Sequence, residues 1–416
     1  ITLPDGQTIT TSAGLSISNP QGITNQVTIS GISDQVTANT GAGSTSIDNI
    51  DGFWRDGVGN ITNTASDDAE NIIDSAAPII VAATTADNNN NGQIDHLTLT
   101  FSESIDDGNS GTFTGTTVDV AGYTGEAKVS GDDDNAEVII SFTEGATPDT
   151  DATPSVTLLS GQVVDADLNT IASNQIFSST DDGAAPVIVS ATTVDADLNG
   201  QIDGIEIVMS EPVDDSGSTL DGSTFDLQAP YDNNSPTAST GDTGNDELLL
   251  ITINEEGSAD TDATPDVTLN SNKVQDQSAA NNQVGSNVLF GSTVDGAIPV
   301  LLLATTSPAA NASGVSINSA RTFSFDFSEN VDAITANNIS IYNTDDLINP
   351  IYSADVTDAE VDVTGSTVTW SHDELLDKGE SYAVGIDAGA FEDQSAGNLP
   401  SDELLNTGDN KWEWSM

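Results

Sequence analysis

The stretch Ala184-Ala-Pro-Val-Ile-Val-Ser-Ala-Thr-Thr193 has two close copies in the chain, Ala76-Ala-Pro-Ile-Ile-Val-Ala-Ala-Thr-Thr85 and Ala297-Ile-Pro-Val-Leu-Leu-Leu-Ala-Thr-Thr306. The prolines of the three copies, Pro78, Pro186 and Pro299, lie 108 and 113 residues apart. A repeat of that length matches one β-sandwich domain, which has about 100 residues. The repeat therefore predicts a tandem of similar domains.

A second shared segment follows each opening and alternates apolar and polar residues. The three copies are His96-Leu-Thr-Leu-Thr-Phe-Ser-Glu103, Gly204-Ile-Glu-Ile-Val-Met-Ser-Glu211 and Thr322-Phe-Ser-Phe-Asp-Phe-Ser-Glu329. This alternation is typical of half-buried strands. The turn Asp149-Thr-Asp-Ala-Thr-Pro154 also recurs as Asp260-Thr-Asp-Ala-Thr-Pro265. Short alternating strands joined by turn residues predict an all-β fold with almost no helix.

Each unit ends with an Asp that is followed four or five residues later by an Asn. The pairs are Asp56/Asn60, Asp165/Asn169, Asp276/Asn281 and Asp393/Asn398. These markers predict complete sandwiches at 76–183, 184–296 and 297–416. Residues 1–75 match only the later part of a unit, so we expect their missing front strands to come from upstream chain or from a neighbouring subunit. The start at Ile1, with neither an initiator Met nor a signal sequence, suggests a processed or excised segment.

The charge of the chain excludes several classes of partner. It has 67 acidic and 6 basic residues among 416, a formal net charge of -61, and no cysteine. Phosphate backbones and anionic membrane surfaces would be repelled, so we expect no nucleic-acid binding. The absence of a long apolar window predicts no membrane insertion. Self-repulsion this large calls for screening salt or bound divalent cations, which favours an extracellular or cell-surface location.

The third unit resembles a known family. The segment Thr306–Val331 and the ending Glu392-Asp-Gln-Ser-Ala-Gly-Asn398 are similar to the opening and closing motifs of bacterial Ig-like domains found in S-layer proteins and large surface adhesins. The resemblance covers about 120 residues. It implies tandem immunoglobulin-like β-sandwich domains in a linear array and a role in a surface fibre, layer or adhesin stalk. It implies no catalytic residue.

The first two units replace the opening loop of that family with an Asp/Asn-rich loop. Oxygen-bearing side chains stand at positions 1, 3, 5 and 9, with Gly at 6, as in the front part of an EF-hand calcium loop. Position 7 would bind through its backbone carbonyl, and position 8 carries an Ile for the core. The predicted Ca²⁺ ligands are Asp87, Asn89, Asn91, Gln93 and Asp95 in the first unit, and Asp195, Asp197, Asn199, Gln201 and Asp203 in the second.

These loops depart from an EF-hand where the bidentate Glu would stand. Position 12 is Thr98 in the first unit and Glu206 in the second, and a strand follows rather than a helix. A missing ligand could come from elsewhere, and the candidates are Asp149, Asp151, Asp260 and Asp262. The alternative is an Asx-rich turn that binds no metal. The loop of the third unit, 307–314, has no carboxylate, so we expect no equivalent site there.

Other polar groups favour structural roles. Asp165-Ala-Asp-Leu-Asn169 repeats the 1-3-5 oxygen spacing without the Gly, and the family resemblance implies a plain turn there, with a metal site as the alternative. Asp132, Asp133 and Asp134 indicate a solvated hairpin tip. The two histidines, His96 and His372, match no catalytic motif, and His372 beside Asp373 is expected at the surface. Trp54, Trp412 and Trp414 are the exceptions to a low aromatic content, and Trp412 and Trp414 alternate on an expected terminal strand, as in core or junction packing.

Together these patterns predict a non-enzymatic structural segment of an extracellular fibre, S-layer or adhesin stalk, stiffened by calcium. Its expected partners are other copies of itself or further domains of the same parent chain. Two alternatives stay open: an adhesin module that binds a sugar or protein ligand, and a segment of a phage or virus fibre. An exposed aromatic cluster would favour the binding module, and matching end surfaces would favour the fibre.

Overall fold

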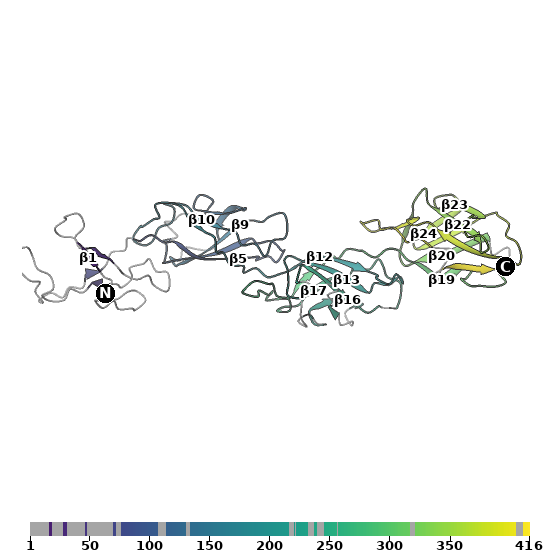
Figure 1. Ribbon diagram of the computed structural model, residues 1–416, viewed down its shortest axis with the longest axis horizontal. Helices are drawn as coiled ribbons and strands as arrows, with labels where there is room; N and C mark the ends of the chain where they lie inside the picture. Colours follow the sequence, from purple (N-terminus) through teal and green to yellow (C-terminus); the bar gives the residue numbers. More distant parts are fainter. Residues whose placement is uncertain are drawn as a thin grey trace, which may run out of the picture. The chain divides into compact units, whose positions relative to one another are not determined.

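The computed structural model describes thirteen stretches of the chain that carry the three sandwiches and four short strands before them. They are residues 16–18, 28–30, 46–47, 70–71, 76–106, 114–129, 134–215, 222–231, 237–238, 245–255, 257–316, 321–404 and 411–416, together with the single residue 220. The described residues form strands and turns without an α-helix, which confirms the all-β prediction (Figure 1). The prediction of a partial sandwich at 1–75 lies outside the described residues, apart from strands β1 (Ser16–Ser18), β2 (Thr28–Ser30), β3 (Ser46–Ile47) and β4 (Glu70–Asn71).

The first sandwich packs a four-stranded sheet on a three-stranded one. The larger sheet has the order β5 (Ile80–Ala86), β6 (His96–Phe101), β9 (Glu137–Thr143) and β8 (Thr124–Lys128). The smaller sheet has the order β11 (Gln175–Phe177), β10 (Val156–Leu158) and β7 (Val118–Val120). Inward residues such as Leu97, Leu99 and Ile140 are fully buried, so alternation along the strands produces the core.

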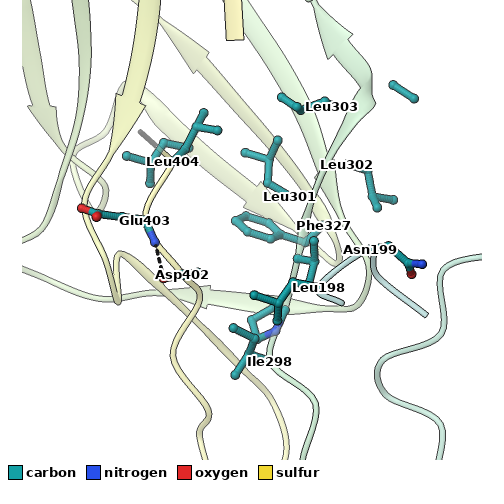
Figure 2. A pocket seen from close by; sticks show the side chains of 14 residues that line it. Leu198, Asn199, Ile298, Leu301, Leu302, Leu303, Phe327, Asp402, Glu403 and Leu404 are labelled. Atoms are coloured by element: carbon teal, nitrogen blue, oxygen red, sulfur yellow. Dashed lines mark hydrogen bonds between the residues drawn. The ribbon is translucent and has the colours of Figure 1, made fainter. Parts of the chain in front are cut away.

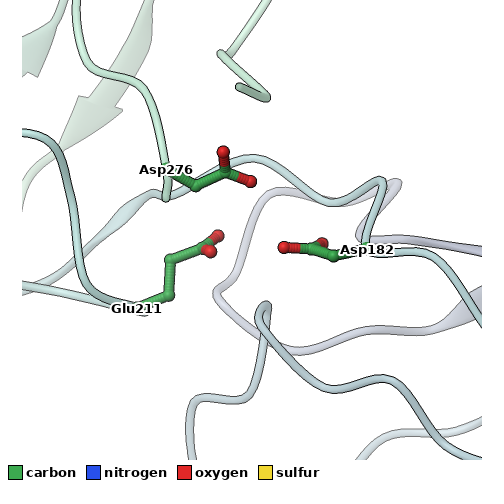
Figure 3. A group of neighbouring side chains, drawn as sticks. All are labelled: Asp182, Glu211 and Asp276. Atoms are coloured by element: carbon green, nitrogen blue, oxygen red, sulfur yellow. The ribbon is translucent and has the colours of Figure 1, made fainter. Parts of the chain in front are cut away.

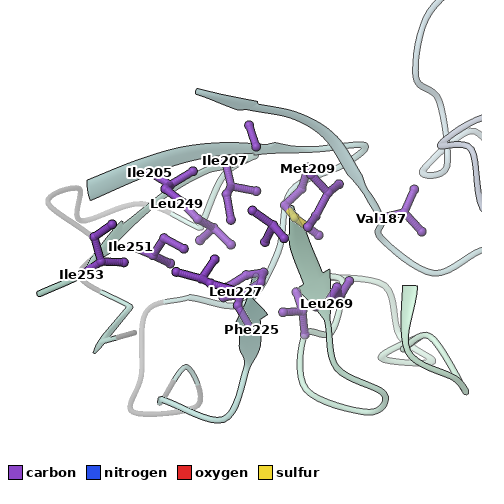
Figure 4. Close-up of a cluster of buried hydrophobic side chains, with 14 of the residues drawn as sticks. Val187, Ile205, Ile207, Met209, Phe225, Leu227, Leu249, Ile251, Ile253 and Leu269 are labelled. Carbon is purple, nitrogen blue, oxygen red and sulfur yellow. The ribbon is translucent and has the colours of Figure 1, made fainter. Parts of the chain in front are cut away.

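The second sandwich repeats this arrangement. Its larger sheet has the order β12 (Ile188–Val194), β13 (Gly204–Met209), β16 (Leu248–Thr252) and β15 (Thr237–Ala238). Its smaller sheet has the order β14 (Phe225–Leu227), β17 (Val267–Leu269) and β18 (Val288–Phe290). Ile205, Ile207 and Ile251 from the larger sheet meet Phe225 and Leu269 from the smaller one in a single core (Figure 4).

The third sandwich has a first sheet of four strands like that of the other two sandwiches, and a second sheet that is larger than theirs. The first sheet has the order β19 (Leu301–Ser307), β20 (Thr322–Phe327), β25 (Thr367–Ser371) and β24 (Val361–Thr364). The second has the order β23 (Tyr352–Asp355), β22 (Asn338–Asn343), β26 (Ser381–Ile386) and β28 (Trp412–Ser415). A two-stranded sheet joins β21 (Val331–Ala333) to β27 (Phe391–Asp393).

The recurring Ser-Glu pair has a structural reason in all three sandwiches. The Ser hydroxyl accepts a hydrogen bond from a backbone N–H of the opening segment, from Ile79 to Ser102 at 3.1 Å and from Val187 to Ser210 at 3.0 Å. In the third sandwich Val300 donates to Ser328 at 2.9 Å. The hydroxyl therefore fastens the start of the opening strand to the end of its neighbour and satisfies a partly buried donor.

The core of the third sandwich is aromatic. Phe323 lies 5.3 Å from Trp370 and 5.1 Å from Trp414 between ring centroids, and it meets Trp412 edge-on at 5.5 Å. Trp412 and Trp414 are 0% and 2% exposed, which confirms that they pack in the core. The loop at 307–314 is covered by β28, because Trp412 Nε1 donates to the Pro308 carbonyl at 2.7 Å.

The contacts between residues divide the chain into two compact units, the first made of Ile1–Asn89 and Gln93–Ala184 and the second of Asn90–Gly92 and Ala185–Met416. The second unit holds the second and third sandwiches. The buried core of the first sandwich still includes Ala184, and that of the second still includes Ala297, each one residue past the predicted boundary. The limits 76–183, 184–296 and 297–416 stay predictions. Within the described residues, no helix has the length and apolar character needed to cross a membrane.

Candidate metal site

The loop between β12 and β13 folds around its own carboxylates. Asp195 accepts backbone N–H groups from Asn199 at 3.2 Å and Gly200 at 2.8 Å. Gly200 has a φ of +94°, a conformation that glycine adopts without steric cost. Ile202, at position 8 of the motif, is fully buried as predicted. The tight turn therefore follows from the Gly and from the Asx-type hydrogen bonds.

Three carboxylates of this loop converge. Asp195, Asp197 and Asp203 each place one oxygen within 4.8 Å of the others. Burial raises the pKa of Asp195, against the lowering effect of its backbone hydrogen bonds. Asp203 Oδ1 also accepts the Ala196 N–H at 3.1 Å. The geometry brings together predicted ligands 1, 3 and 9, a set of hard oxygens that suits Ca²⁺.

The equivalent loop of the first sandwich carries fewer carboxylates. Asp95 Oδ1 accepts the Asn88 N–H at 2.9 Å, the counterpart of the bond at Asp203. Asp95 also contacts His96 Nδ1 at 2.5 Å. Gly92 has a φ of +90°, and Ile94 is fully buried. The local fold matches the second loop, but Asn89 stands where the second loop has Asp197.

Both loops contact a Glu that sequence reasoning missed. Asn89 Nδ2 donates to Glu144 at 2.5 Å, and Asn199 Nδ2 donates to Glu255 at 2.7 Å. Gln201 Nε2 reaches the other oxygen of Glu255 at 3.5 Å. The two glutamates follow equivalent strands, β9 and β16, at the same end of each sandwich. Their matching position after these strands was the signal available in the sequence.

The recurring Asp-Thr-Asp turn holds the loops in place. Asp149 Oδ1 accepts the Ile94 N–H and Asp260 Oδ1 accepts the Ile202 N–H, both at 2.9 Å. Their other oxygens accept the hydroxyls of Tyr123 and Tyr231. Asp149 and Asp260 are thus anchors of the loop backbone.

The other residues considered as an additional calcium ligand do not anchor the loop backbone. Asp151 and Asp262 are exposed. Glu206 is exposed on β13, and Thr98 lies within β6, so position 12 continues the strand. Neither Thr98 nor Glu206 completes an EF-hand, because each lies on the sheet face opposite to the buried residues of its own strand.

The second loop lies against the third sandwich. A Cβ built on Gly200 would lie 3.0 Å from Leu302 Cδ2 and 3.2 Å from Ser328 Cβ. Leu198 and Asn199 line a pocket with apolar residues of the third sandwich, and Leu198 lies near Ile298 and Phe327 (Figure 2). The loop therefore contributes directly to the joint between these two sandwiches.

Substituting Gly200 by Ala tests this close approach. We expect Gly200→Ala to destabilise the chain by about 1–3 kcal/mol, because it adds both backbone strain and a steric conflict with Leu302. Gly257→Ala is the control for strain alone, since Gly257 has a φ of +80° and open space around it. Gly285→Ala, with open space and no positive φ, should be nearly neutral. Urea unfolding of the three variants gives the comparison, and equal stabilities for Gly200→Ala and Gly257→Ala would contradict the close approach.

The Asp at each unit ending closes a turn, as predicted for Asp165. Asp165 accepts the backbone N–H of Asp167 at 2.9 Å and of Asn169 at 2.8 Å, and the Asn169 side chain at 2.7 Å. In the second sandwich the bonding partner of Asp276 is Asn282, whereas the sequence pattern had pointed to Asn281. The reason is that Asn281 adopts a φ of +52° and turns the chain, so that the next residue reaches back to the Asp.

The histidines have structural surroundings. His372 was expected at the surface, and this was wrong: it is only 4% exposed and stacks on Phe323 at 5.5 Å. The strand alternation of Val368 and Trp370 continues through His372 and directs it to the core. Of the Asp132–Asp134 run only Asp134 is described, with a φ of +45°. Trp54 lies outside the described residues.

Comparison with known proteins identifies the third sandwich. A family model described as "Bacterial Ig-like domain" matches residues 299–413. Residues 299–413 are a bacterial Ig-like domain. The first and second sandwiches share the strand order of its first sheet, in which the opening strand pairs with the Ser-Glu strand, so the three described sandwiches form a tandem of Ig-like β-sandwiches. No curated protein matches the chain in sequence.

Several solved structures are similar at low sequence identity. The S-layer protein rSbsC is 11% identical, with 80% of this chain and 55% of that chain covered and a TM-score of 0.18. Domains 3–5 of Drosophila OTK are 12% identical, with 66% and 77% covered and a TM-score of 0.18. The BSP domain of a biofilm-associated protein is 8% identical, with 78% and 66% covered and a TM-score of 0.15. TM-scores this low do not establish a shared fold along the whole chain, so the family match carries the assignment.

Proposed function

We propose that the chain is a non-enzymatic structural segment of an extracellular surface assembly, such as a fibre, an S-layer or an adhesin stalk. The observation that carries this proposal is the repetition of one Ig-like sandwich, with the loop at 195–203 of the second packed directly on the third. Direct contact between successive domains is what a segment that transmits force or sets spacing requires. The partners under this proposal are further domains of the same parent chain or other copies of it.

Calcium is the proposed stiffening ion at the two loops. The convergence of Asp195, Asp197 and Asp203 is the strongest support for calcium binding. The side chains of Asn199 and Gln201 in the same loop donate hydrogen bonds to Glu255. The loop at Asp87, Asn89, Asn91, Gln93 and Asp95 is the weaker copy, because two of its five positions are carboxylates. A net charge of -61 adds a general reason for divalent counter-ions.

A labelling experiment tests the location. Antibodies raised against the third sandwich, coupled to gold, should decorate the outside of intact source cells or of fibres and layers shed from them. Permeabilised cells serve as the control, since they expose the interior. Label that appears only after permeabilisation would contradict the proposal, because an interior protein cannot build a surface assembly.

A further inference from the structure

Three buried carboxylates meet where the second sandwich ends and the third begins. Asp295 precedes β19, Glu329 follows β20, and Asp393 ends β27. One oxygen of each lies within 4.8 Å of the others. Their exposed fractions are 9%, 5% and 0%. None of the three forms an ion pair with a described lysine, arginine or histidine.

Asp393 has one oxygen with hydrogen-bond donors and one without. Oδ1 accepts the N–H groups of Ser395 at 3.2 Å and Leu399 at 2.8 Å, whereas the buried Oδ2 has no partner. The equivalent Asp276 has its Oδ2 satisfied by the Asn282 side chain at 2.8 Å. In the third sandwich Leu399 stands in the place of that Asn, so the donor is lost and the carboxylate is kept.

The second sandwich shows the same pair of acids at the equivalent positions. Glu211 and Asp276 lie on the end of the Ser-Glu strand and at the unit ending, and their carboxylates point toward each other (Figure 3). In the sequence these residues stand out only as markers of the repeat. Their recurrence in the second and third sandwiches was the available signal for a binding role.

The carboxylates of Asp295, Glu329 and Asp393 are held close together despite their mutual repulsion. Burial is the main cause that raises the pKa of Glu329 to about 8 and that of Asp295 to about 6, and the charge of Asp393 raises both further. Thr261 of the second sandwich donates to Glu329 Oε1 at 2.8 Å and fixes its position. An uncompensated cluster of buried anions is costly, so a proton or a cation must accompany it.

We propose that Asp295, Glu329 and Asp393 bind one calcium ion that bridges the second and third sandwiches. All three ligands are hard oxygens, and they lie within 4.8 Å of one another, close enough for one ion to contact all three through Ca–O bonds of about 2.4 Å. Mg²⁺ dehydrates reluctantly and is usually bound through one or two carboxylates, so three protein carboxylates favour Ca²⁺. Asp262, Asn330 and Gln394 line the adjoining hollow and leave room for further oxygen ligands or water. This ion is additional to those proposed in the two loops.

The test uses the full chain and the variant Glu329→Gln, which keeps the shape and removes one charge. Calcium titration by calorimetry should show one equivalent fewer for the variant than for the unsubstituted chain. Unfolding is followed by tryptophan fluorescence, because three of the four tryptophans, Trp370, Trp412 and Trp414, lie in the core of the third sandwich. In calcium the variant should melt about 4–8 °C lower. In chelator it should melt at the same temperature or higher, since one of the mutually repelling acids is gone.

A variant that melts lower than the unsubstituted chain in calcium, but not in chelator, has lost a metal ligand. A residue that only packs would lower the melting temperature in both conditions. A loss of stability of equal size in calcium and in chelator, or an unchanged stoichiometry, would overturn the proposal. Glu374→Gln is the matched control, because Glu374 is exposed in the same sandwich, and it should alter neither measurement. Magnesium in place of calcium should give a smaller shift in the unsubstituted chain.

Two more variants keep this site distinct from the loops. Leu399→Asn restores the donor found at Asn169 and Asn282 and should reduce the calcium response without lowering stability in chelator. The double variant Asp195→Asn/Asp203→Asn should lose the loop ion while the calcium response of the tryptophans persists. Loss of that response in the loop variant, with Glu329→Gln behaving like the control, would assign the ion to the loop alone and reject the junction site.

Discussion

Chelation of calcium is expected to accelerate hydrogen exchange in β12 and β13 of the second sandwich by about 100-fold. A ligand present at 100 times its dissociation constant stabilises the native state by about 2.7 kcal/mol. Its removal lowers the free energy of the opening that precedes exchange by the same amount. The loop at Asp195 and Asp203 joins these two strands, so their amides report its occupancy directly. Exchange measured by mass spectrometry on peptides of the full chain resolves each sandwich separately.

The loop variant Asp195→Asn/Asp203→Asn provides the control. Its calcium response in β12 and β13 should be much smaller than that of the unsubstituted chain, and what remains should come from the ion proposed at Asp295, Glu329 and Asp393. The first sandwich should respond less than the second, because its loop has Asn89 where the second has Asp197. Identical exchange in calcium and in chelator for the unsubstituted second sandwich would mean that the loop is an ordinary Asx turn.

Trp412→Ala is expected to destabilise the third sandwich by about 3–5 kcal/mol, the cost of truncating a buried large aromatic residue. Trp412 is 0% exposed and meets both Phe323 and Phe325 edge-on at 5.5 Å. Its Nε1 also fastens the loop at Pro308 to the terminal strand. Loss of the side chain leaves a cavity and releases the Pro308 carbonyl.

Hydrogen exchange again gives the measurement, and the damage should be confined to the third sandwich. β20 and β26 should exchange much faster, while β6 and β10 of the first sandwich keep their rates. Trp412→Phe retains most of the apolar surface but not the hydrogen bond, so its exchange rates in the third sandwich should lie between those of the unsubstituted chain and those of Trp412→Ala. Equal acceleration in all three sandwiches would show that they unfold as one cooperative body and would contradict separate cores.

The strand pattern was predictable because one face of each strand is buried. The alternation in 97–101, 205–209 and 323–327 gives the inward residues directly, and the repeat at Pro78, Pro186 and Pro299 gives the number of sandwiches. His372 was wrongly predicted at the surface because it follows the end of β25 and is flanked by polar residues, although it continues the alternation of buried residues along that strand. The third sandwich's extra strands, such as β28, had no counterpart in the other two units.

The loop ligands were predictable from spacing, since a tight Gly turn brings neighbouring positions together. The convergence of Asp195, Asp197 and Asp203 follows from such local geometry. Glu144 and Glu255 were not predictable in this way, because they approach across more than 50 residues of sequence. The same holds for Glu329 and Asp393, which the fold of the third sandwich brings together, and for Asp295, which joins them from the end of the second repeat.

The bond from Thr261 to Glu329 has a consequence for how such chains diversify. One partner is encoded in the second repeat and the other in the third, and they lie 2.8 Å apart in the folded protein. Recombination that inserts, deletes or exchanges whole repeats would keep the contact, provided that the copy before the joint carries the Asp-Thr-Asp turn and the copy after it carries the Ser-Glu pair. All three copies carry the Ser-Glu pair. A gene built in this way can therefore change its length by unequal crossing-over without redesigning the joint that follows the second repeat.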